Sequence, residues 1–376
     1  MEAILILFFI YGLLYAYYIF RLIYGFSKIT SSQNRNSDPK TAFSIVIPFR
    51  NESKNLPILL KSLSNLDYPA TLIEYIFVDD FSTDDSAKII NRWRLENDSV
   101  HTTMLDNVRI SKSPKKDAIN RAIPIVMHSW IITTDADCTF LPTWLSAIND
   151  FVLHNNVEMI AGPVLYKNSL NPLHQFQQTD FLALQGATIG GFGLQKAFMG
   201  NAANFAFTKN LFHEVGGFSG NDHVASGDDV FLLQKAFARF PQKVKYLKSE
   251  NAIVSTQPAS GFLNLFFQRV RWASKASSYD HEFAEMLAIV VFIGNAVLCG
   301  AFILTLADKM DYQVLIGLFL LKFIPDYILV LKANAFLRKG RFTFPILSGI
   351  IYPFFAVSVG LYSLYGKYSW KGRTLN

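Results

Sequence analysis

The apolar positions of this 376-residue chain fall into two patterns, long unbroken runs near its two ends and short runs between them. The first long run, residues 3–20, has about the 18 residues that a membrane-spanning helix needs at minimum. Three more runs, near residues 286–307, 312–331 and 342–365, also reach that length. The pattern predicts an N-terminal transmembrane anchor, a segment outside the membrane, and about three further spans.

A cleaved signal peptide is the alternative interpretation of the first run. The run starts at Glu2 instead of a basic residue, and bulky residues occupy the end where a cleavage site needs small ones. These features favour a retained anchor over residues 1–24. The basic residues that follow it predict, by the positive-inside rule, that the next segment is cytoplasmic; they are Arg21, Lys28, Arg35 and Lys40.

Short apolar runs alternate with amphipathic helices between a polar linker, residues 25–42, and about residue 257. The clearest elements are strands at Phe43–Pro48, Tyr75–Val78, Trp130–Thr134 and Met159–Pro163, and helices at Asn55–Leu66 and Ser86–Glu96. Such alternation is typical of an α/β domain with a mostly parallel sheet and helices on both faces. We predict this domain over residues 43–257.

Paired aspartates follow several of these short runs. They stand at Asp79-Asp80, at Asp135 and Asp137 in a Thr-Asp-Ala-Asp sequence, and at Asp228-Asp229. Ligands of open α/β sheets bind at the carboxyl ends of the strands, where these side chains should converge. Separated carboxylates there suit a metal-bound pyrophosphate and a general base.

The order of these motifs, together with the later sequence Gln268-Arg269-Val270-Arg271-Trp272, resembles the inverting family 2 glycosyltransferases. The resemblance is to the membrane-integral branch with a Gln-x-x-Arg-Trp motif, which includes ceramide glucosyltransferase and the cellulose and hyaluronan synthases. It covers about residues 43–275. It implies a GT-A fold and transfer of a sugar from a nucleotide-diphosphate sugar, with UDP as the expected nucleotide.

The resemblance places three donor contacts near the nucleotide base. Pro48 and Glu52 match the Pro-x-x-Asn-Glu loop that follows the first strand. Asp80 matches the carboxylate that accepts a hydrogen bond from a uracil-like imide. Ser82 and Asp84 are expected to cap the next helix, and a capping role for the whole cluster is the alternative.

Further donor contacts involve the diphosphate. Lys115 matches the first residue of a Lys-x-x-Ala-Leu-Asn motif and would offset diphosphate charge, although Ser113-Pro114 replaces the usual Gly pair. A solvated residue at a helix start is the alternative for Lys115. The resemblance assigns Asp137 to a Mg²⁺ or Mn²⁺ ion and Asp135 to the metal and the donor. Such ions take few carboxylates together with waters and substrate phosphates.

The third pair supplies the expected catalytic group. Asp229 matches the base that deprotonates the acceptor hydroxyl, and Asp228 stands where a Glu is more common. Acidic residues are also favourable at a helix N-terminus, so capping is the alternative role.

Acceptor contacts are implied for Asn204, Gln268 and Trp272, and Arg271 would pair with diphosphate oxygens. A structural role is the alternative for the segment that contains Asn204. The Phe-rich stretch before the motif predicts an interfacial segment over residues 258–282, and anchoring alone is the alternative for the motif.

The remaining segment, residues 283–376, is the predicted C-terminal membrane region. Its topology stays open because Lys332 to Arg341 predicts a cytoplasmic loop, while Lys367, Lys371 and Arg373 would then lie on the other side. Lys322 and Asp326 share one face of the second span, either as a neutralised pair or at the border of the acceptor path.

Composition agrees with a membrane enzyme. Charged residues make up 17% of the chain, below the usual share of about 25%. The net charge is a modest +6, and the sequence contains no block of Lys and Arg of the kind that binds nucleic acid. Cys138 and Cys299 have no metal-ligand spacing and no reason to pair. The expected partners are a nucleotide sugar, a lipid or glycan acceptor and membrane lipids, with partner subunits if the product is a polysaccharide.

Three alternatives to transfer onto a lipid remain open. A subunit of a processive polysaccharide synthase fits the same motifs, although four spans make a small bundle for moving a polymer. A glycoside hydrolase also uses two carboxylates, but it would not need Lys115 and Arg271 as phosphate ligands. A non-catalytic scaffold would not need Asp229.

Overall fold

The computed structural model describes residues 2–33, 35–221, 224, 227–275, 281–340, 345–365, 368–370 and 373–375. Arg341, Lys367 and Lys371 therefore lie outside the described residues. The chain forms two compact units. The helical unit comprises Met1–Ile29, Asn168–Phe198 and Pro258–Asn376, and the sheet unit comprises Thr30–Lys167 and Met199–Gln257.

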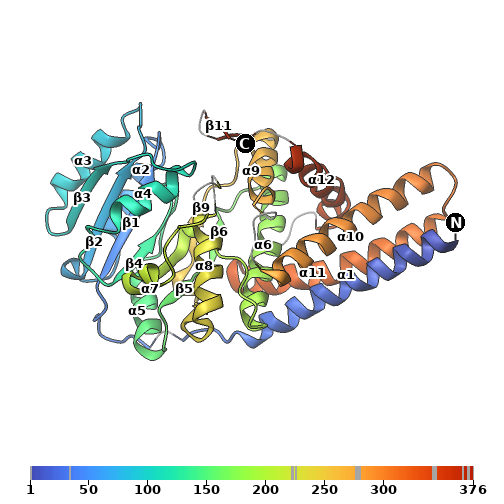
Figure 1. Ribbon diagram of the computed structural model, residues 1–376, viewed down its shortest axis with the longest axis horizontal. Helices are drawn as coiled ribbons and strands as arrows, with labels where there is room; N and C mark the ends of the chain where they lie inside the picture. The colour runs from blue at the N-terminus through green and yellow to red at the C-terminus, as the bar shows by residue number, and fades with distance from the viewer. Residues whose placement is uncertain are drawn as a thin grey trace. The chain divides into compact units, whose positions relative to one another are not determined.

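A seven-stranded sheet in the order β3-β2-β1-β4-β7-β5-β8 is the centre of the sheet unit (Figure 1). Its strands are β1 (Phe43–Phe49), β2 (Ile73–Asp79), β3 (His101–Asp106), β4 (Trp130–Thr133), β5 (Met159–Ala161), β7 (Phe205–Thr208) and β8 (Val244–Tyr246). All neighbours pair in parallel except β7, which runs antiparallel to both β4 and β5. The mixed, mostly parallel α/β fold predicted from the sequence is confirmed.

The central strands form because their residues are apolar on both faces. Every residue of β2 is buried, and in β1 only Pro48 is partly exposed, as expected for strands inside a parallel sheet. Their register pairs Phe43 with Ile73 and Phe49 with Asp79, so both strands end at the same edge. A second, two-stranded sheet joins β6 (Val164–Tyr166) to β9 (Val254–Thr256).

Helices connect these strands. They are α2 (Leu56–Ser64), α3 (Ser86–Glu96), α4 (Pro114–Ala122), α5 (Trp144–His154), α7 (Lys209–Glu214) and α8 (Asp228–Arg239), with single 3₁₀ turns at Ala70–Leu72, Ala202–Asn204, Pro241–Lys243 and Glu250–Ala252. The two helices predicted from apolar spacing, α2 and α3, are both present.

The predicted linker differs from an open tether, because the side chains of two buried α5 residues hold its backbone. The Asp150 carboxylate accepts hydrogen bonds from the amides of Arg35 and Ser37, at 2.8 and 2.9 Å. The Asn149 side-chain oxygen accepts from the amides of Lys40 and Thr41. The linker is thus held through its backbone amides and needs no apolar side chains of its own, which is consistent with its polar composition.

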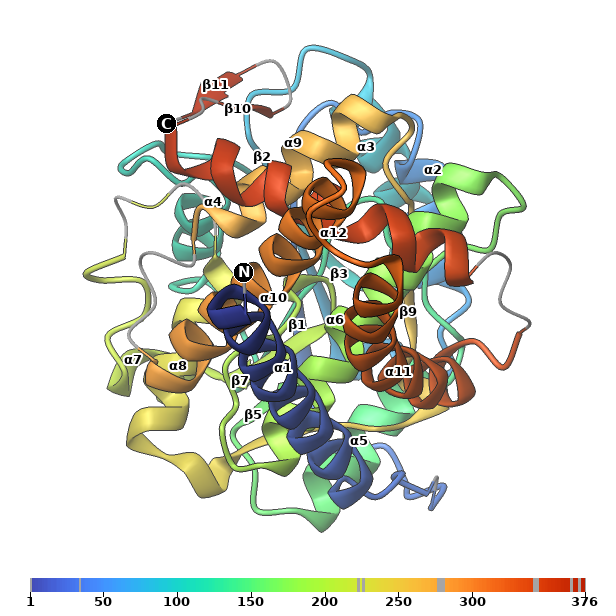
Figure 2. The same cartoon turned by 90° about the vertical axis from the view of Figure 1, so that its right-hand side faces the viewer.

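The helical unit contains α1 (Glu2–Lys28), α6 (Pro172–Gly193), α9 (Phe262–Ala273), α10 (Glu282–Leu306), α11 (Tyr312–Leu337) and α12 (Pro345–Tyr365), with short strands β10 (Tyr368–Trp370) and β11 (Arg373–Leu375). In the described part of the chain, four helices are long and apolar enough to cross a membrane, namely α1, α10, α11 and residues Ile346–Leu364 of α12. In Figure 2, α1 lies beside α10 and α11, with which it is in contact.

Two boundaries in this unit differ from the sequence prediction. The anchor was expected to end at residue 24, but α1 continues to Lys28 because Gly25 and Phe26 pack inside the unit. The loop expected from Lys332 is wrong, since α11 continues to Leu337 and the Lys332 ammonium donates to Ser27 Oγ at 3.2 Å. Residues 332–337 hold no helix breaker, so packing extends the span beyond its most apolar part.

The helix α6 falls inside the segment 43–257 that the sequence assigned to one α/β domain, yet it belongs to the helical unit. Glycines explain this placement. A Cβ atom at Gly25 would overlap the carbonyl oxygen of Gly190, and one at Gly193 would overlap that of Gly25. The backbones of α1 and α6 therefore approach more closely than any side chain permits.

Candidate functional site

The Thr-Asp-Ala-Asp motif follows β4 directly. Thr134 is fully buried, and its hydroxyl donates to the carbonyl of Ala203 at 2.8 Å, which fixes the strand end. Asp135 and Asp137 are half-buried on either side of the buried Ala136. The alternation leaves both carboxylates at the strand end with part of their surface open to a ligand.

Lys115, in the first turn of α4, connects two of the predicted motifs. Its ammonium lies 2.5 Å from Asp135 Oδ1 and 3.3 Å from Asp228 Oδ2. Its side chain is only 21% exposed, so it is not the solvated helix-start residue that was the alternative. Burial alone would lower the pKa of Lys115, but the charges of Asp135 and Asp228 outweigh it and hold the pKa above its usual value. The ammonium therefore stays charged beside the two carboxylates.

The Asp228-Asp229 pair begins α8 after Gly227, whose φ of +86° is a conformation that favours glycine. Asp229 Oδ2 accepts a hydrogen bond from the amide of Ala202 at 3.0 Å, and its Oδ1 accepts from the amide of Val230 at 2.8 Å. Both carboxylates also favour the helix N-terminus electrostatically. Capping and orientation of Asp229 are thus present in the structure, and its role as a base remains a prediction.

Asp80 is surrounded by two residues that the sequence reasoning missed. Its Oδ1 accepts from Asn107 Nδ2 at 2.8 Å and lies 3.2 Å from Arg109 Nε. Asn107 and Arg109 follow β3, the parallel neighbour of β2. The rule that polar groups gather at carboxyl ends of strands could have found them, had the short polar run of β3 been recognised as a strand.

The other predicted base contacts lie at the same edge of the sheet. The amide of Asp80 donates to the carbonyl of Phe49, the residue after Pro48, at 2.9 Å. Glu52 is buried, and its Oε2 accepts from Asn55 Nδ2 at 2.6 Å. The structure therefore brings Pro48, Glu52 and Asp80 to the ends of two adjacent strands.

The two residues expected to cap α3 differ in what they do. Asp84 accepts from the amide of Ser86, the first residue of α3, and from the amide of Ser53. Burial opposes ionisation of Asp84, but hydrogen bonds from Ser86 and Ser53 lower its pKa to about 2. Ser82 does not cap α3, because its hydroxyl accepts from the amide of Asn51 and so closes the loop after β1.

Asn204 was predicted to contact the acceptor, and in the structure its side chain forms hydrogen bonds within the sheet unit. Its side-chain amide donates to the carbonyls of Pro163 and Ala252, at 2.9 and 2.8 Å. Its side-chain oxygen accepts from Trp144 Nε1 at 3.1 Å. Asn204 is buried and joins three parts of the sheet unit, which favours the structural role, and its contact with the acceptor stays a prediction.

The Gln-x-x-Arg-Trp motif lies on α9 in the helical unit. Leu265 and Val270 of this helix are fully buried against α12, while Phe262 and Leu263 are exposed at its start, as expected of an interfacial helix. Gln268, Arg271 and Trp272 are half-buried.

The residue between the motif positions, Arg269, makes two close polar contacts and lies over an aromatic ring. Its Nε lies 2.6 Å from Asp180 Oδ2, its Nη1 donates to Gln268 Oε1 at 2.6 Å, and its guanidinium carbon lies 4.2 Å from the centre of the Trp272 ring. Sequence reasoning passed over Arg269 because it occupies a variable position of the motif.

The donor set fits a divalent cation that arrives with phosphates. Among the described residues, no group of three or more His, Cys, Asp or Glu could hold a metal. Two half-buried carboxylates, Asp135 and Asp137, match Mg²⁺ or Mn²⁺ completed by waters and a diphosphate better than an all-protein cage. Burial, and next the charge of Asp137, raises the pKa of the neighbouring Cys138, so this thiol stays protonated and is a poor metal ligand.

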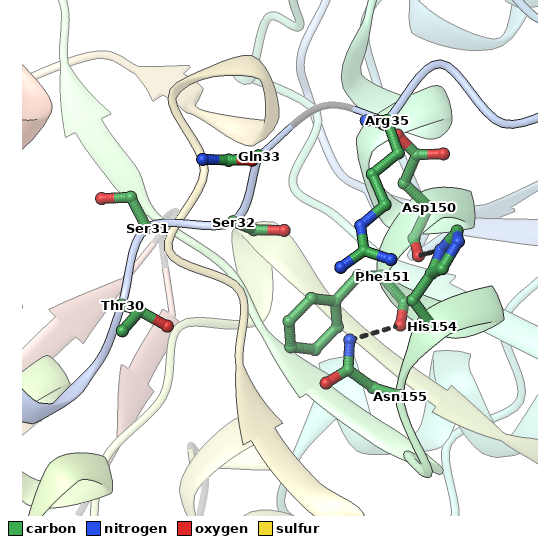
Figure 3. Close-up of a pocket in the computed structure, with 9 residues that line it drawn as sticks. All are labelled: Thr30, Ser31, Ser32, Gln33, Arg35, Asp150, Phe151, His154 and Asn155. Carbon is green, nitrogen blue, oxygen red and sulfur yellow. Dashed lines mark hydrogen bonds between the residues drawn. The ribbon is translucent and has the colours of Figure 1, made fainter.

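A separate polar pocket of about 290 Å³ lies between the linker and the end of α5 (Figure 3). Its lining residues are Thr30, Ser31, Ser32, Gln33, Arg35, Asp150, Phe151, His154 and Asn155. None of these is a predicted site residue, so the pocket reports how the linker docks and not where the chemistry takes place.

Comparison with known proteins gives one family. The profile described as Glycosyl transferase family 2 matches residues 44–222. The mannosyltransferase PcManGT from Pyrobaculum calidifontis, solved in complex with GDP-Man and Mn²⁺, is 17% identical with a TM-score of 0.62 and covers 97% of this chain and 99% of its own. At that identity the likeness shows the fold.

Two curated relatives match shorter stretches. The glycosyltransferase AglE of Haloferax volcanii is 20% identical over 195 residues, 51% of this chain and 60% of that protein. The poly(ribitol-phosphate) beta-N-acetylglucosaminyltransferase TarS of Staphylococcus aureus is 40% identical over 52 residues, 14% of this chain and 9% of that protein. The chain thus spans less than two thirds of either relative.

Proposed function

We propose that this chain, whose residues 44–222 match glycosyl transferase family 2, is a membrane-bound inverting enzyme that moves a sugar from a nucleotide-diphosphate sugar to a lipid or lipid-linked acceptor. One observation carries the proposal. Lys115 pairs with both Asp135 at the end of β4 and Asp228 at the start of α8. A single cation therefore joins the motif proposed for the diphosphate to the motif proposed for the base.

Asp135 and Asp137 would hold a Mg²⁺ or Mn²⁺ ion together with the donor diphosphate. The bound ion would neutralise the charge that develops on the leaving nucleotide. The ammonium of Lys115 adds a second positive charge at the same strand end, and Arg271 is proposed to add bidentate contacts to diphosphate oxygens. The GDP-Man and Mn²⁺ in the PcManGT structure support a cation for a protein of this fold.

Asp229 is the proposed general base. The acceptor hydroxyl oxygen would attack the anomeric carbon, the bond from that carbon to the diphosphate oxygen would break, and the hydroxyl proton would pass to the Asp229 carboxylate. The amides of Ala202 and Val230 orient this carboxylate. One displacement inverts the configuration at the anomeric carbon. Asp228, paired with Lys115, would hold the ammonium in place beside the base.

The nucleotide base would lie beside Asp80, Pro48 and Glu52. Asn107 and Arg109 hold Asp80 Oδ1 and so fix its carboxylate for a hydrogen bond from a uracil imide. UDP is the nucleotide that this arrangement favours.

The four long apolar helices support a multi-pass membrane protein. The basic residues in the last part of α1 and after it, Arg21, Lys28, Arg35 and Lys40, favour a cytoplasmic catalytic segment by the positive-inside rule. A lipid acceptor would then be reached at the membrane surface, with Gln268 and Trp272 as the proposed acceptor contacts. The Trp272 ring offers an aromatic face for a sugar or lipid head group.

A polymer acceptor is the second candidate, in which the chain would be one subunit of a polysaccharide synthase. The short match to TarS favours it, because that protein is named for transfer onto poly(ribitol-phosphate).

A panel assay tests both candidates. The purified protein is incubated with UDP-, GDP- and dTDP-linked sugars and either membrane lipid extract or extracted cell-wall glycan, and radiolabelled product is counted. We expect lipid-soluble label with a UDP-sugar. Label in the glycan fraction alone would favour the polymer, and release of free sugar without any transfer would contradict the proposed function.

A further inference from the structure

The ion pair between Asp180 of α6 and Arg269 of α9 is almost completely enclosed. The side chains are 4% and 7% exposed, and the distance from Arg269 Nε to Asp180 Oδ2 is 2.6 Å. Removing one partner of a buried pair leaves the other charge without compensation, which is costly. The position of α9 relative to α6 is therefore tied to this contact.

A second contact from α6 holds the backbone just before α9. The side-chain amide of Gln177 donates to the carbonyl of Ala259 at 2.9 Å, and its oxygen accepts from the amide of Ala259 at 2.8 Å. Gln177 is fully buried. Two residues of α6, one turn apart, thus fix both the entry to α9 and its middle.

The pair also continues into the membrane-length helices. Tyr352 of α12 interacts electrostatically with Asp180. The Lys322 ammonium of α11 lies 5.4 Å from the centre of the Tyr352 ring and 2.6 Å from Asp326 Oδ2, and Asp326 Oδ1 accepts from the hydroxyl of Tyr15 at 2.7 Å. Contacts between buried and half-buried polar side chains therefore run from α9 through α6, α12 and α11 to α1.

The Arg269 side of the ion pair contacts two residues of the Gln-x-x-Arg-Trp motif. The guanidinium of Arg269 donates to the Gln268 side chain and lies over the ring of Trp272. Those are the two residues of α9 that the proposed function assigns to the acceptor. One buried guanidinium holds both of them, and Asp180 holds the guanidinium.

We infer that Asp180 is a positioning residue for acceptor transfer, which acts through Arg269 to orient Gln268 and Trp272. This inference rests on the proposed function for the roles of Gln268 and Trp272. It adds a residue from α6, far from the motif in sequence, to the acceptor side of the reaction.

The substitution Asp180→Asn tests it, since the change keeps the side chain's size and removes its charge. A misplaced reacting group costs on the order of 10²-fold in rate, so we expect about that loss in kcat/KM for the acceptor, with the donor KM unchanged. Asp180→Glu should recover part of the activity because it restores the charge. Arg269→Lys should match Asp180→Asn, because an ammonium cannot reproduce the planar fork.

The matched control is Glu158→Gln, which breaks the 2.6 Å ion pair with Lys243 in the sheet unit and should leave both KM values unchanged. The kinetic assay uses the nucleotide sugar that gives turnover in the panel and a titration of membrane lipid extract. A lower melting temperature for Asp180→Asn with wild-type kinetics would overturn the inference.

Hydrogen–deuterium exchange of residues 262–273 decides the inference independently of activity. Asp180→Asn and Arg269→Lys should raise exchange in α9, and Asp180→Glu should restore protection, whether or not the wild type transfers sugar. If Asp180→Asn does not fold, exchange in Asp180→Glu and Arg269→Lys gives the result. Unchanged protection of α9 in the folded variants would overturn the inference, whereas absent transfer by the wild type would overturn only the proposed function.

Discussion

Each unit of this protein contains an ion pair between a basic side chain and an aspartate, but the two pairs differ in burial and therefore in what they can do. In the sheet unit, Lys115 pairs with Asp135, whose side chain is 40% exposed, and the pair lies at a strand end. In the helical unit, Arg269 pairs with Asp180, and both side chains are nearly without exposure. The first pair can exchange its partners for a ligand, whereas the second cannot be separated without leaving a buried charge.

The exposed pair is therefore suited to binding a ligand, and the buried pair is suited to holding α9 in position. Loss of the Asp135, Asp137 or Asp229 carboxylate from the sheet unit should impair the proposed chemistry and leave the fold intact. Loss of the Asp180 carboxylate from the helical unit should displace α9 and leave the donor site intact. Four predictions follow from the contrast, beginning with the largest effect.

Removal of divalent cations should abolish transfer, because the negative carboxylates of Asp135 and Asp137 would then face the negative diphosphate without a positive ion between them. Activity is measured with excess chelator and after Mg²⁺ or Mn²⁺ is restored. Asp137→Asn should behave like the chelated enzyme, and Asp85→Asn, an exposed carboxylate paired with Lys88, is the matched control. Full activity in excess chelator would remove the metal assignment.

Asp229→Asn should lower turnover by roughly 10²–10⁴-fold, because the amide keeps the shape of the side chain but accepts no proton. Nucleotide-sugar affinity, measured by titration calorimetry, should survive. Asp228→Asn is the comparison, and it should weaken donor binding through Lys115. Near-normal turnover in Asp229→Asn together with a large loss in Asp228→Asn would transfer the base role to Asp228.

The motif on α9 should show a smaller, divided effect. Trp272→Ala should raise the apparent KM of the acceptor by about tenfold, equal to 1.4 kcal/mol, and leave that of the donor unchanged. Arg271→Lys should instead weaken the donor, because bidentate geometry is lost. Both titrations need variants of equal folded yield. Small and equal effects on both substrates would leave the motif with an anchoring role only.

The pH dependence of stability should show the smallest effect. The pKa of Lys115 is raised above its ordinary 10.5, so the folded protein holds this proton more tightly than the unfolded chain does. Its contribution to stability is complete below that pH and is lost as pH rises through the folded pKa. The difference in melting temperature between the wild type and Lys115→Met should therefore stay constant from pH 7 to about 10. A difference that closes below pH 9 would contradict the ion pair.

Most of the sheet could be predicted because β1, β2 and β4 are short apolar runs whose pattern local physics decides. The Asp motifs were predictable for the same reason, since each follows such a run or begins a helix. The hydrogen bonds of the Asn204 side chain could not be predicted, because its three partners are residues 144, 163 and 252. No sequence window contains them.

The helical unit shows the same limit more strongly. The spans were visible from their length, but α6 carries polar residues such as Gln177 and Asp180 that resemble a solvated helix. Their partners, Ala259 and Arg269, are more than 80 residues away. These polar residues are buried because they pair with residues distant in the sequence, and residue type alone could not predict that burial.

The position of β7 has a consequence for biosynthesis. This strand bridges β4 and β5, yet it is synthesised only after the α6 segment. Until residue 208 emerges, β4 and β5 have open edges that can pair with other chains. We expect nascent chains that stop between α6 and β7 to need chaperone protection. A pause in translation once residue 208 has emerged from the ribosome should improve the folded yield.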